Sequence, residues 1–332
     1  MIASINTVKS QNPDFLKIIE YGIKAPSGHN TQPWKFKLKE KSIEIHPNLD
    51  KTLPVVDGNH RELYISLGCA LENICVAASN FGYTSQADIL QKDSVYIIEI
   101  KLQKTESLKA DPLFSQIEKR QTNRSIFKSK MISADTLVML QRMRTNPNVS
   151  MFYYKKGEPE FETLSKYIYT GNEIFYNDKA FRKEVLTWMR FNKKDVLKQN
   201  DGLAYNTVGS PSLPKWLGRP IVSSFLTPKK QNKSEEDKIK TTSHFVTFTT
   251  NDNTPKGWIL TGQSLENYWL HCTELGIAVA FSNQPCESAS LASEISKQLP
   301  INNELPMLLL RIGYADPMPY SVRKTLKDVI IE

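Results

Sequence analysis

Residues 68–83, GCALENICVAASNFGY, align without a gap to residues 262–277, GQSLENYWLHCTELGI. Gly68 matches Gly262, the triplet Leu-Glu-Asn recurs, and Gly82 matches Gly276. Both copies carry small or apolar residues at helical spacing and end at a glycine suited to a helix C-cap. Each copy therefore predicts a long, mostly buried helix, and the pair predicts an internal duplication.

A weaker repeat joins residues 12–26 to residues 133–147, where an Asp, the following apolar residues and a closing Pro coincide. Each stretch has Asn or Ser at its start, and both residues suit a helix N-cap. Every predicted helix is followed by a strand-like run, at residues 34–47, 95–102, 149–156 and 307–314. The order helix, strand, long helix, strand thus occurs twice.

This order predicts two duplicated α+β halves that meet near residue 115, namely residues 1–115 and residues 116–332. A duplication alone leaves two interpretations open. The halves can simply stack and bury each other's faces, or a ligand site can lie between them, as clefts at domain interfaces often do.

The composition predicts a globular protein with a real core, since 40% of the 332 residues are apolar and 23% are charged. No stretch approaches the roughly 18 apolar residues of a membrane span, and the start of the sequence has no signal-peptide pattern. We therefore expect a soluble, cytoplasmic protein with no membrane partner. The mixed-charge run at residues 229–240 predicts a mobile surface loop.

The net charge of +8 is compatible with binding nucleic acid, an acidic surface or a phosphorylated small molecule. Lys35, Lys37, Lys39 and Lys41 alternate as on the wet face of a strand, and no nucleic-acid-binding motif accompanies them. We expect no nucleic-acid partner.

Several familiar chemistries lack their motifs. The four cysteines form no CxxC pair and no zinc-like cluster, so we expect no bound metal. Three of the cysteines, Cys69, Cys75 and Cys272, fall within helical patterns, and we expect them to be buried apolar residues. Gly-x-Gly, HExxH and GxSxG do not occur. Nucleotide binding by a Rossmann or Walker loop and the usual hydrolytic sites are therefore unsupported.

Three short segments carry polar chemistry. The loop at residues 25–34, APSGHNTQPW, offers two amides and a hydroxyl beside a Trp, which suits a planar heteroaromatic, although a capped turn before a strand would look the same. The segment at residues 120–124, RQTNR, places two guanidinium groups four residues apart, which suits a phosphate and a second negative charge, although such a pair is more often solvated surface. The third segment, Ser321-Val322-Arg323-Lys324, says little alone.

Together these segments resemble the nitroreductase superfamily of FMN enzymes. APSGHNTQPW is similar to that family's PSxxNxQPW loop, and RQTNR is similar to its RxSxR element with Thr in place of Ser. Residues 265–285 resemble its central helix and the segment under the flavin, and residues 307–326 resemble its last strand and basic tail. The length and the duplicated plan resemble the long, internally fused branch typified by the Acg proteins, with residues 155–250 the poorest match.

The resemblance implies a nitroreductase-like fold in which the two halves form an intertwined single-chain pseudo-dimer around antiparallel or mixed sheets. The first half has no Arg before Arg61, and the second half has NPNVS at residues 146–150 where the PSxxN loop would recur. One composite FMN site per chain is therefore expected, built from both halves. Such a pseudo-dimer favours a monomer over an obligate homodimer.

The resemblance also assigns roles to residues. Arg120, Thr122 and Arg323 would bind the phosphate and ribityl chain, and Arg124 would lie near N1 and C2=O, where a fixed cation favours reduction of the ring. Gly28 replaces a Ser that is common in the family loop. Arg190 is either a second cation near the flavin ring or a surface Arg. Residues 225–245 are a candidate lid over the site. The full set of expected cofactor-binding residues is Pro26, Ser27, Gly28, Asn30, Gln32, Arg120, Gln121, Thr122, Arg124, Arg190, Ser282, Asn283, Gln284 and Arg323.

The implied activity is an FMN-dependent NAD(P)H oxidoreductase that transfers hydride by a ping-pong route to a nitroaromatic, a quinone or a related acceptor. Backbone groups near residues 283 and 284 would approach N5, so no side-chain acid or base is expected to be essential. The second hypothesis is a flavin-sequestering protein with a covered FMN and little turnover. The third is a partner-binding protein that kept the fold and lost the cofactor.

Overall fold

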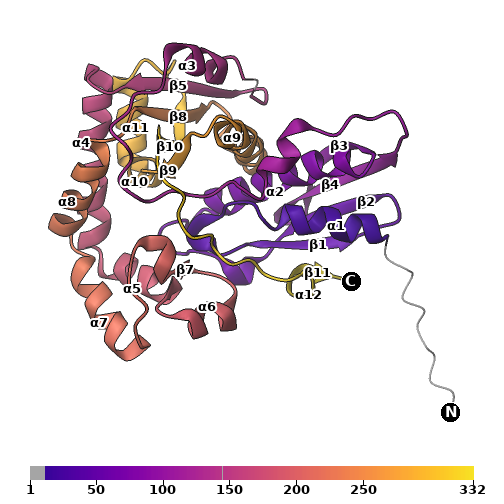
Figure 1. Ribbon diagram of the computed structural model, residues 1–332, viewed down its shortest axis with the longest axis horizontal. Coiled ribbons are helices and arrows are strands. Elements are labelled where there is room, and N and C mark those ends of the chain that lie inside the picture. The colour runs from indigo at the N-terminus through magenta and orange to yellow at the C-terminus, as the bar shows by residue number, and fades with distance from the viewer. Residues whose placement is uncertain (1–11, 144) are drawn as a thin grey trace.

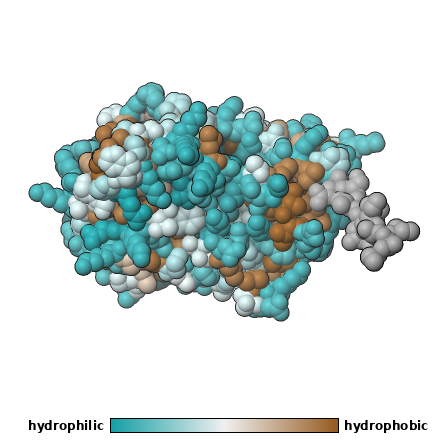
Figure 2. Space-filling model, turned by 90° about the horizontal axis from the view of Figure 1, so that it is seen from below, coloured by the Kyte–Doolittle hydropathy of each residue, from teal (hydrophilic) through white to brown (hydrophobic). Residues whose placement is uncertain are grey.

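The computed structural model describes residues 12–143 and 145–332, and it places two sheets on either side of a central pair of helices (Figure 1). The first sheet has the strand order β11-β1-β2-β4-β3 and the second has the order β5-β8-β10-β9. A short parallel pair, β6-β7, lies apart from both. The face seen from below is mostly hydrophilic, with apolar atoms in separate patches (Figure 2).

The first sheet is built from consecutive hairpins, with one parallel strand added from the far end of the chain. Its strands are β1 (Trp34–Leu38), β2 (Ser42–Pro47), β3 (Tyr83–Lys92), β4 (Val95–Lys104) and β11 (Ile330–Ile331). In β1 the buried Trp34 and Phe36 alternate with half-buried Lys35 and Lys37, as the sequence predicted. The expected run at residues 34–47 is a hairpin of two strands, because the chain turns at residues 39–41.

The second sheet is antiparallel throughout, and its strand β8 is fully buried. Its strands are β5 (Val149–Lys155), β8 (His244–Thr250), β9 (Ala278–Phe281) and β10 (Leu305–Gly313), and β6 (Met189–Arg190) and β7 (Leu203–Ala204) form the separate pair. Helices α10 (Gln284–Glu287) and α11 (Ala289–Gln298) connect β9 to β10. Every residue of β8 is buried, which is why this strand reads as a continuous run rather than an alternating one.

The two repeated segments form helices α2 (Arg61–Asn80) and α9 (Pro255–Glu274), which pack against each other at the centre of the molecule. Both are followed by a glycine with positive φ, Gly82 at 74° and Gly276 at 68°. The duplication and the two predicted helices are therefore confirmed.

The equivalent glycines of the repeat make the closest approach between these helices. A Cβ atom added to Gly68 would lie 2.0 Å from the carbonyl oxygen of Ile259, and one added to Gly262 would lie 1.9 Å from that of Ile65. Gly68 and Gly262 are equivalent in the repeat, as are Ile65 and Ile259, so the contact is reciprocal. It relates the two halves by an approximate two-fold axis, and the predicted α+β class with two duplicated halves and mixed sheets is confirmed.

Smaller helices flank this core. The weaker repeat corresponds to α1 (Pro13–Gly22) and α3 (Ala134–Gln141), whose N-caps are Asn12 and Ser133. The side chain of each cap accepts a backbone N–H of the first turn, from Asp14 or Thr136. The N-terminal ends of both predicted helices are therefore correctly assigned.

Residues 155–250, which match the family pattern least, contain β6, β7 and β8 and a layer of helices. The helices are α4 (Pro159–Asn177), α5 (Lys179–Trp188), α6 (Lys193–Gln199), α7 (Lys215–Phe225) and α8 (Pro228–Ile239). Helices α4 and α8 lie beside the second sheet, and α5, α6 and α7 lie below it in the view of Figure 1. The carboxylate of Glu184 on α5 accepts the backbone N–H groups of Val55 and Val56, at 2.9 and 3.1 Å. This contact fastens the helical layer to the first half of the chain.

The run at residues 229–240 is helical, and its prediction as a mobile loop is wrong. Lys233 and Lys240 both pair with Glu236, at spacings of three and four residues, and such pairs stabilise a helix. Buried Glu235 and Ile239 dock α8 against α4. Residues 225–245 do not line the cavity described below, so this structure does not place the candidate lid against it.

The C-terminal segment crosses from the second half to the first. After β10 the chain runs to α12 (Leu326–Val329) and β11, which pairs in parallel with β1. Cys69, Cys75 and Cys272 lie within α2 and α9 as predicted, and burial raises the pKa of each thiol. None of the helices in the described residues is apolar and long enough to cross a membrane.

We expect Gly262→Ala to destabilise the protein, because the new Cβ would collide with a backbone carbonyl that cannot move without separating the two helices. The free energy of unfolding should fall by at least about 2 kcal/mol, despite the better helix propensity of Ala. Thermal and denaturant unfolding measure the change. Gly58→Ala is the control, because its Cβ would meet only an ordinary 3.4 Å contact with the oxygen of Pro54. Equal stabilities of the two variants would contradict the packing argument.

Candidate functional site

A cavity of about 290 Å³ lies between the two halves, and the predicted motifs converge on it. Its walls come from the loop after α1, the start of α2, the RQTNR segment, the β9–α10 junction and the C-terminal segment. Eleven of the fourteen predicted residues line it: Pro26, Ser27, Gly28, Asn30, Arg120, Gln121, Thr122, Arg124, Asn283, Gln284 and Arg323.

The loop after α1 has an unusual backbone that the rest of the site holds in place. His29, Asn30 and Gln32 all have positive φ, between 49° and 55°, which is uncommon for residues other than glycine. Ser27 Oγ accepts the backbone N–H of Gln32 at 3.0 Å. Asn30 donates from Nδ2 to the carbonyl oxygens of Gly202 and Val322, each at 3.2 Å, so this one side chain joins three distant segments.

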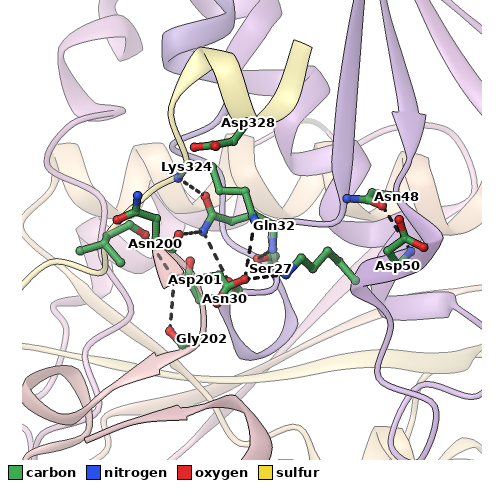
Figure 3. Close-up of polar contacts among 12 residues, drawn as sticks. Ser27, Asn30, Gln32, Asn48, Asp50, Asn200, Asp201, Gly202, Lys324 and Asp328 are labelled. Carbon is green, nitrogen blue, oxygen red and sulfur yellow. Dashed lines mark hydrogen bonds and ion pairs between the residues drawn. The ribbon is translucent and has the colours of Figure 1, made fainter. Parts of the chain in front are cut away.

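Gln32 does not line the cavity but lies buried behind the loop (Figure 3). It donates from Nε2 to the carbonyl oxygen of Asn200 at 2.8 Å, and its Oε1 accepts the backbone N–H of Lys324 at 2.8 Å. Gln32 was predicted to bind the cofactor, but its hydrogen bonds hold the loop after α1 and the C-terminal segment in position and do not reach the cavity.

Arg120 is buried, and its charge already has a partner. Its Nε lies 2.9 Å from Glu266 Oε1 as an ion pair, although the two atoms are not aligned as a hydrogen bond, and its guanidinium stacks over Trp269 at 5.1 Å. Burial raises the pKa of Glu266 to about 7, against the attraction of Arg120. Arg120 thus joins the RQTNR segment to helix α9 while one face of it reaches the cavity.

A second guanidinium lies close to the first. Arg120 and Arg323 both donate from Nη2 to the carbonyl oxygen of Lys24, at 2.6 and 3.0 Å. Arg323 also donates from Nη1 to Asn30 Oδ1 at 3.1 Å, and its Nε is buried without a hydrogen-bond partner among the described residues. Burial, together with the repulsion of Arg120, lowers the pKa of Arg323 to about 9. Two cations held this close favour an anion beside them.

Arg124 lines the cavity with no hydrogen bond or ion pair from its side chain to any described residue. Burial lowers its pKa to about 10, so it stays charged at neutral pH. Burial and the charge of Arg124 lower the pKa of His29, another lining residue, to about 4. The cavity therefore contains a fixed cation next to a neutral imidazole.

Sequence reasoning missed two carboxyl groups in the cavity wall, those of Glu62 and Glu287. Asn283 donates from Nδ2 to both, at 2.7 and 3.3 Å, and its Oδ1 accepts the backbone N–H of Leu309. Burial and mutual repulsion raise the pKa of Glu62 well above its usual range. Only the position of Glu287, three residues after the predicted Gln284, could have drawn attention to it.

The backbone of the RQTNR segment is attached to both the second sheet and the tail. Thr122 forms an isolated parallel bridge with Val279 of β9. Gln121 Oε1 accepts the backbone N–H of Met318 at 2.5 Å, and Asn123 donates to the carbonyl oxygen of Asp316 at 2.8 Å. These contacts fix the direction in which the flanking arginines point.

Arg190 and Ser282 were expected at the cofactor but do not line the cavity. Arg190 is buried and donates to Asp201 Oδ1 at 2.6 Å. Lys51 and Lys324 approach the other carboxylate oxygen of Asp201, at 2.9 and 3.6 Å. This cluster supports the segment at residues 200–202 that holds the loop after α1 (Figure 3). Ser282 is buried between Phe281 and Asn283, which both line the cavity.

The helical layer closes one side of the cavity with apolar side chains. Helix α4 contributes Tyr176 to this side, α5 contributes Phe181 and Val185, and strand β7 contributes Leu203. Burial raises the pKa of Tyr176 above its usual range, so its hydroxyl stays neutral. This side of the cavity, for which the sequence predicted no residues, is therefore hydrophobic and aromatic.

The comparisons with known proteins agree with the sequence motifs. No family model matches the chain. The protein named "Putative NAD(P)H nitroreductase Rv3131" of Mycobacterium tuberculosis is 21% identical over 99% of this chain and 94% of its own length. From the same organism, "Uncharacterized protein Rv3127" is 23% identical over 89% of this chain and 85% of its own length. The predicted resemblance to the nitroreductase superfamily is confirmed.

A solved structure of an FMN and NADPH-dependent nitroreductase NfnB mutant derived from a Sphingopyxis strain is 14% identical. The match covers 67% of this chain and 99% of that chain with a TM-score of 0.42. A structural likeness this loose carries no argument about the site.

We expect Asp201→Asn to destabilise the protein at neutral pH, because buried Arg190 would lose its carboxylate partner. Removing one member of a buried pair typically costs about 3 kcal/mol or more. The hydrogen bonds from Arg190 and Lys51 lower the pKa of Asp201, against the effect of burial, so its contribution exists above its unfolded pKa and disappears as the pH falls through the folded one.

The measurement is chemical denaturation of wild type and Asp201→Asn between pH 3 and 7. The difference in stability should be largest at neutral pH and should shrink toward pH 3. Asp135→Asn on the exposed end of α3 is the control and should leave stability within about 0.5 kcal/mol. A difference for Asp201→Asn that does not change with pH would contradict the ion-pair explanation.

Proposed function

We propose that this relative of the nitroreductase superfamily is an FMN-dependent NAD(P)H oxidoreductase that passes electrons to a nitroaromatic, a quinone or a related acceptor. The observation that carries the proposal is Arg124, a charged guanidinium that faces the cavity without any anionic partner among the described residues. The name of the relative aligned over 99% of this chain supports the same activity.

The residues of the cavity fit a flavin nucleotide. Arg323 has a buried Nε without a partner and lies beside a second guanidinium, as a phosphate group would require. Arg124 lies elsewhere in the wall and suits the part of a flavin that becomes negative on reduction. Phe181 and Val185 supply an apolar surface for a planar ring.

A bound flavin would supply the redox chemistry, accepting two electrons from a nicotinamide and passing them to the acceptor. The chain's own residues would bind and orient the two substrates in turn. Asn30 joins the loop after α1 directly to the C-terminal segment at the cavity wall, and the aromatic wall from the helical layer would exclude water. Arg124 would stabilise negative charge without moving a proton, because its pKa of about 10 keeps it charged.

The carboxyl groups of Glu62 and Glu287 would hold a proton at the cavity wall. They lie within hydrogen-bonding reach of each other, and burial raises the pKa of each, which favours retention of a proton by the pair. Reduction of a quinone or a nitro group consumes protons as well as electrons. We therefore assign the pair as a proton source, a role for which the sequence provided no candidate.

A second candidate function is flavin sequestration with little turnover, as the sequence also left open. The observation in its favour is the closed apolar wall formed by Tyr176, Phe181, Val185 and Leu203. A cofactor shielded on that side would exchange electrons with bulky acceptors slowly. The two functions share one cavity and differ in whether bound FMN reacts.

The first test is whether the purified protein binds FMN and whether NADH or NADPH bleaches it without oxygen. We expect a yellow protein that bleaches and is reoxidised by a quinone or a nitroarene. Arg124→Ala should weaken FMN binding at least roughly tenfold or lower the flavin's reduction potential, because it removes the unpartnered cation. Arg142→Ala, an exposed arginine outside the cavity, is the matched control.

The outcomes separate the hypotheses. A yellow protein that never bleaches removes the oxidoreductase and leaves sequestration. A colourless protein that takes up no added FMN rejects both. Equal effects of the two arginine substitutions would mean that the site has been placed wrongly.

Glu62→Gln tests the proton source through its pH dependence. Because burial raises the pKa of Glu62, the wild-type rate of acceptor reduction should fall as the pH rises through this raised pKa and the pair loses its proton. Gln cannot donate that proton, so the rate should drop by roughly 100-fold at pH values where the wild-type pair is protonated, and it should lose this pH dependence.

The measurement is stopped-flow reoxidation of the reduced protein by a quinone between pH 5 and 9. Glu118→Gln, at an exposed position away from the cavity, is the control. FMN binding and bleaching by NAD(P)H should survive in both variants. An unchanged pH profile in Glu62→Gln would reject the role of the pair.

A further inference from the structure

Helix α7 carries an apolar face that nothing in the described chain covers. Leu217, Ile221 and Phe225 recur every four residues and are 37%, 41% and 55% exposed, and Trp216 beside them is 77% exposed. At 3.6 residues per turn this spacing forms one stripe, the arrangement that a surface helix normally turns toward a core. Here the stripe faces outward.

The way α7 is attached explains this orientation. Gly218 is the only buried residue of the helix, and a Cβ added to it would lie 2.9 Å from a ring carbon of Phe191. Val222, one turn later on the same side, packs into the cluster around α5. The helix is therefore fixed to the protein along its narrow Gly218–Val222 side, and the stripe lies on a different side.

The surroundings of the stripe are strongly basic. Residues 202–234 contain five Lys or Arg and no Asp or Glu. Lys215, Arg219, Lys229 and Lys230 are all exposed, and none has a carboxylate partner among the described residues. Lys230 lies over the ring of Phe225 at 4.4 Å, so charge and apolar surface are directly adjacent.

We propose that α7 docks on an anionic lipid surface, with the Trp216–Phe225 stripe in the interfacial region and the basic residues on lipid headgroups. An exposed apolar helix face flanked by Lys and Arg is the physical requirement for such binding. The charge pattern disfavours a second copy of the chain, because an interface between two such faces would bring eight cations together without a single carboxylate. This proposal is independent of the proposed function and departs from the sequence expectation of no membrane partner.

The test is co-sedimentation of the full chain with vesicles of phosphatidylcholine alone or with 30% phosphatidylglycerol. We expect binding only to the anionic vesicles, weakening as salt is raised because the attraction is screened. The tryptophan emission should shift to the blue on binding, and Trp216→Phe should remove most of that shift, since the other described tryptophans are buried or half-buried.

Two double variants separate the contributions. Lys215→Glu/Arg219→Glu should reduce the partition coefficient by at least roughly 25-fold, about fivefold for each basic residue. Ile221→Ser/Phe225→Ser should reduce it at least tenfold without changing the net charge. Met139→Ser on α3 and Lys166→Glu on α4 are matched controls, because both side chains are exposed far along the chain from the stripe.

Each alternative outcome overturns the proposal. Absence of binding to anionic vesicles rejects it directly. Equal losses in Lys166→Glu would show attraction by overall charge rather than by α7. Concentration-dependent dimerisation that is abolished by Ile221→Ser/Phe225→Ser, without vesicle binding, would identify a second copy as the occupant. Thermal unfolding of each variant establishes that the fold is intact.

Discussion

The reciprocal backbone contact of Gly68 with Ile259 and of Gly262 with Ile65 is the constraint on which the rest of the molecule depends. It brings α2 and α9 so close that each glycine meets a carbonyl oxygen of the other helix. All the segments of the cavity are attached to these two helices or to the sheets that pack on them. An error of one residue in this contact would separate the arginines of one half from the loop of the other.

The two repeated helices are nearly symmetric, but equivalent residues in them have different partners. Glu72 and Glu266 occupy equivalent positions in the repeat, but their partners differ. Glu72 accepts amide hydrogen bonds from Gln263 and Asn267, at 3.0 and 2.7 Å, whereas Glu266 lies against Arg120. The duplication therefore supplied two similar frameworks, and only one of them kept the guanidinium that a ligand site needs.

The residue pattern alone predicted the features that depend on local structure, namely the repeated helices and their caps. The convergence of the loop with RQTNR was expected only from the resemblance to the nitroreductase superfamily, because local pattern does not show which distant segments meet. Residues 229–240 were misjudged because a mixed charge run favours a helix when its charges fall three or four residues apart. Glu62 and Gln32 could not be placed, since their roles come from contacts more than 160 residues away in the chain.

The parallel pairing of β11 with β1 has a consequence for synthesis on the ribosome. The loop after α1 emerges 293 residues before Arg323, to which Asn30 is hydrogen-bonded, and the strand that completes the first sheet follows Arg323. The edge of β1 must therefore stay unpaired while all the intervening residues are translated, a period in which exposed edges favour aggregation. A nascent chain stalled before Arg323 would carry both repeated helices and still lack a closed site.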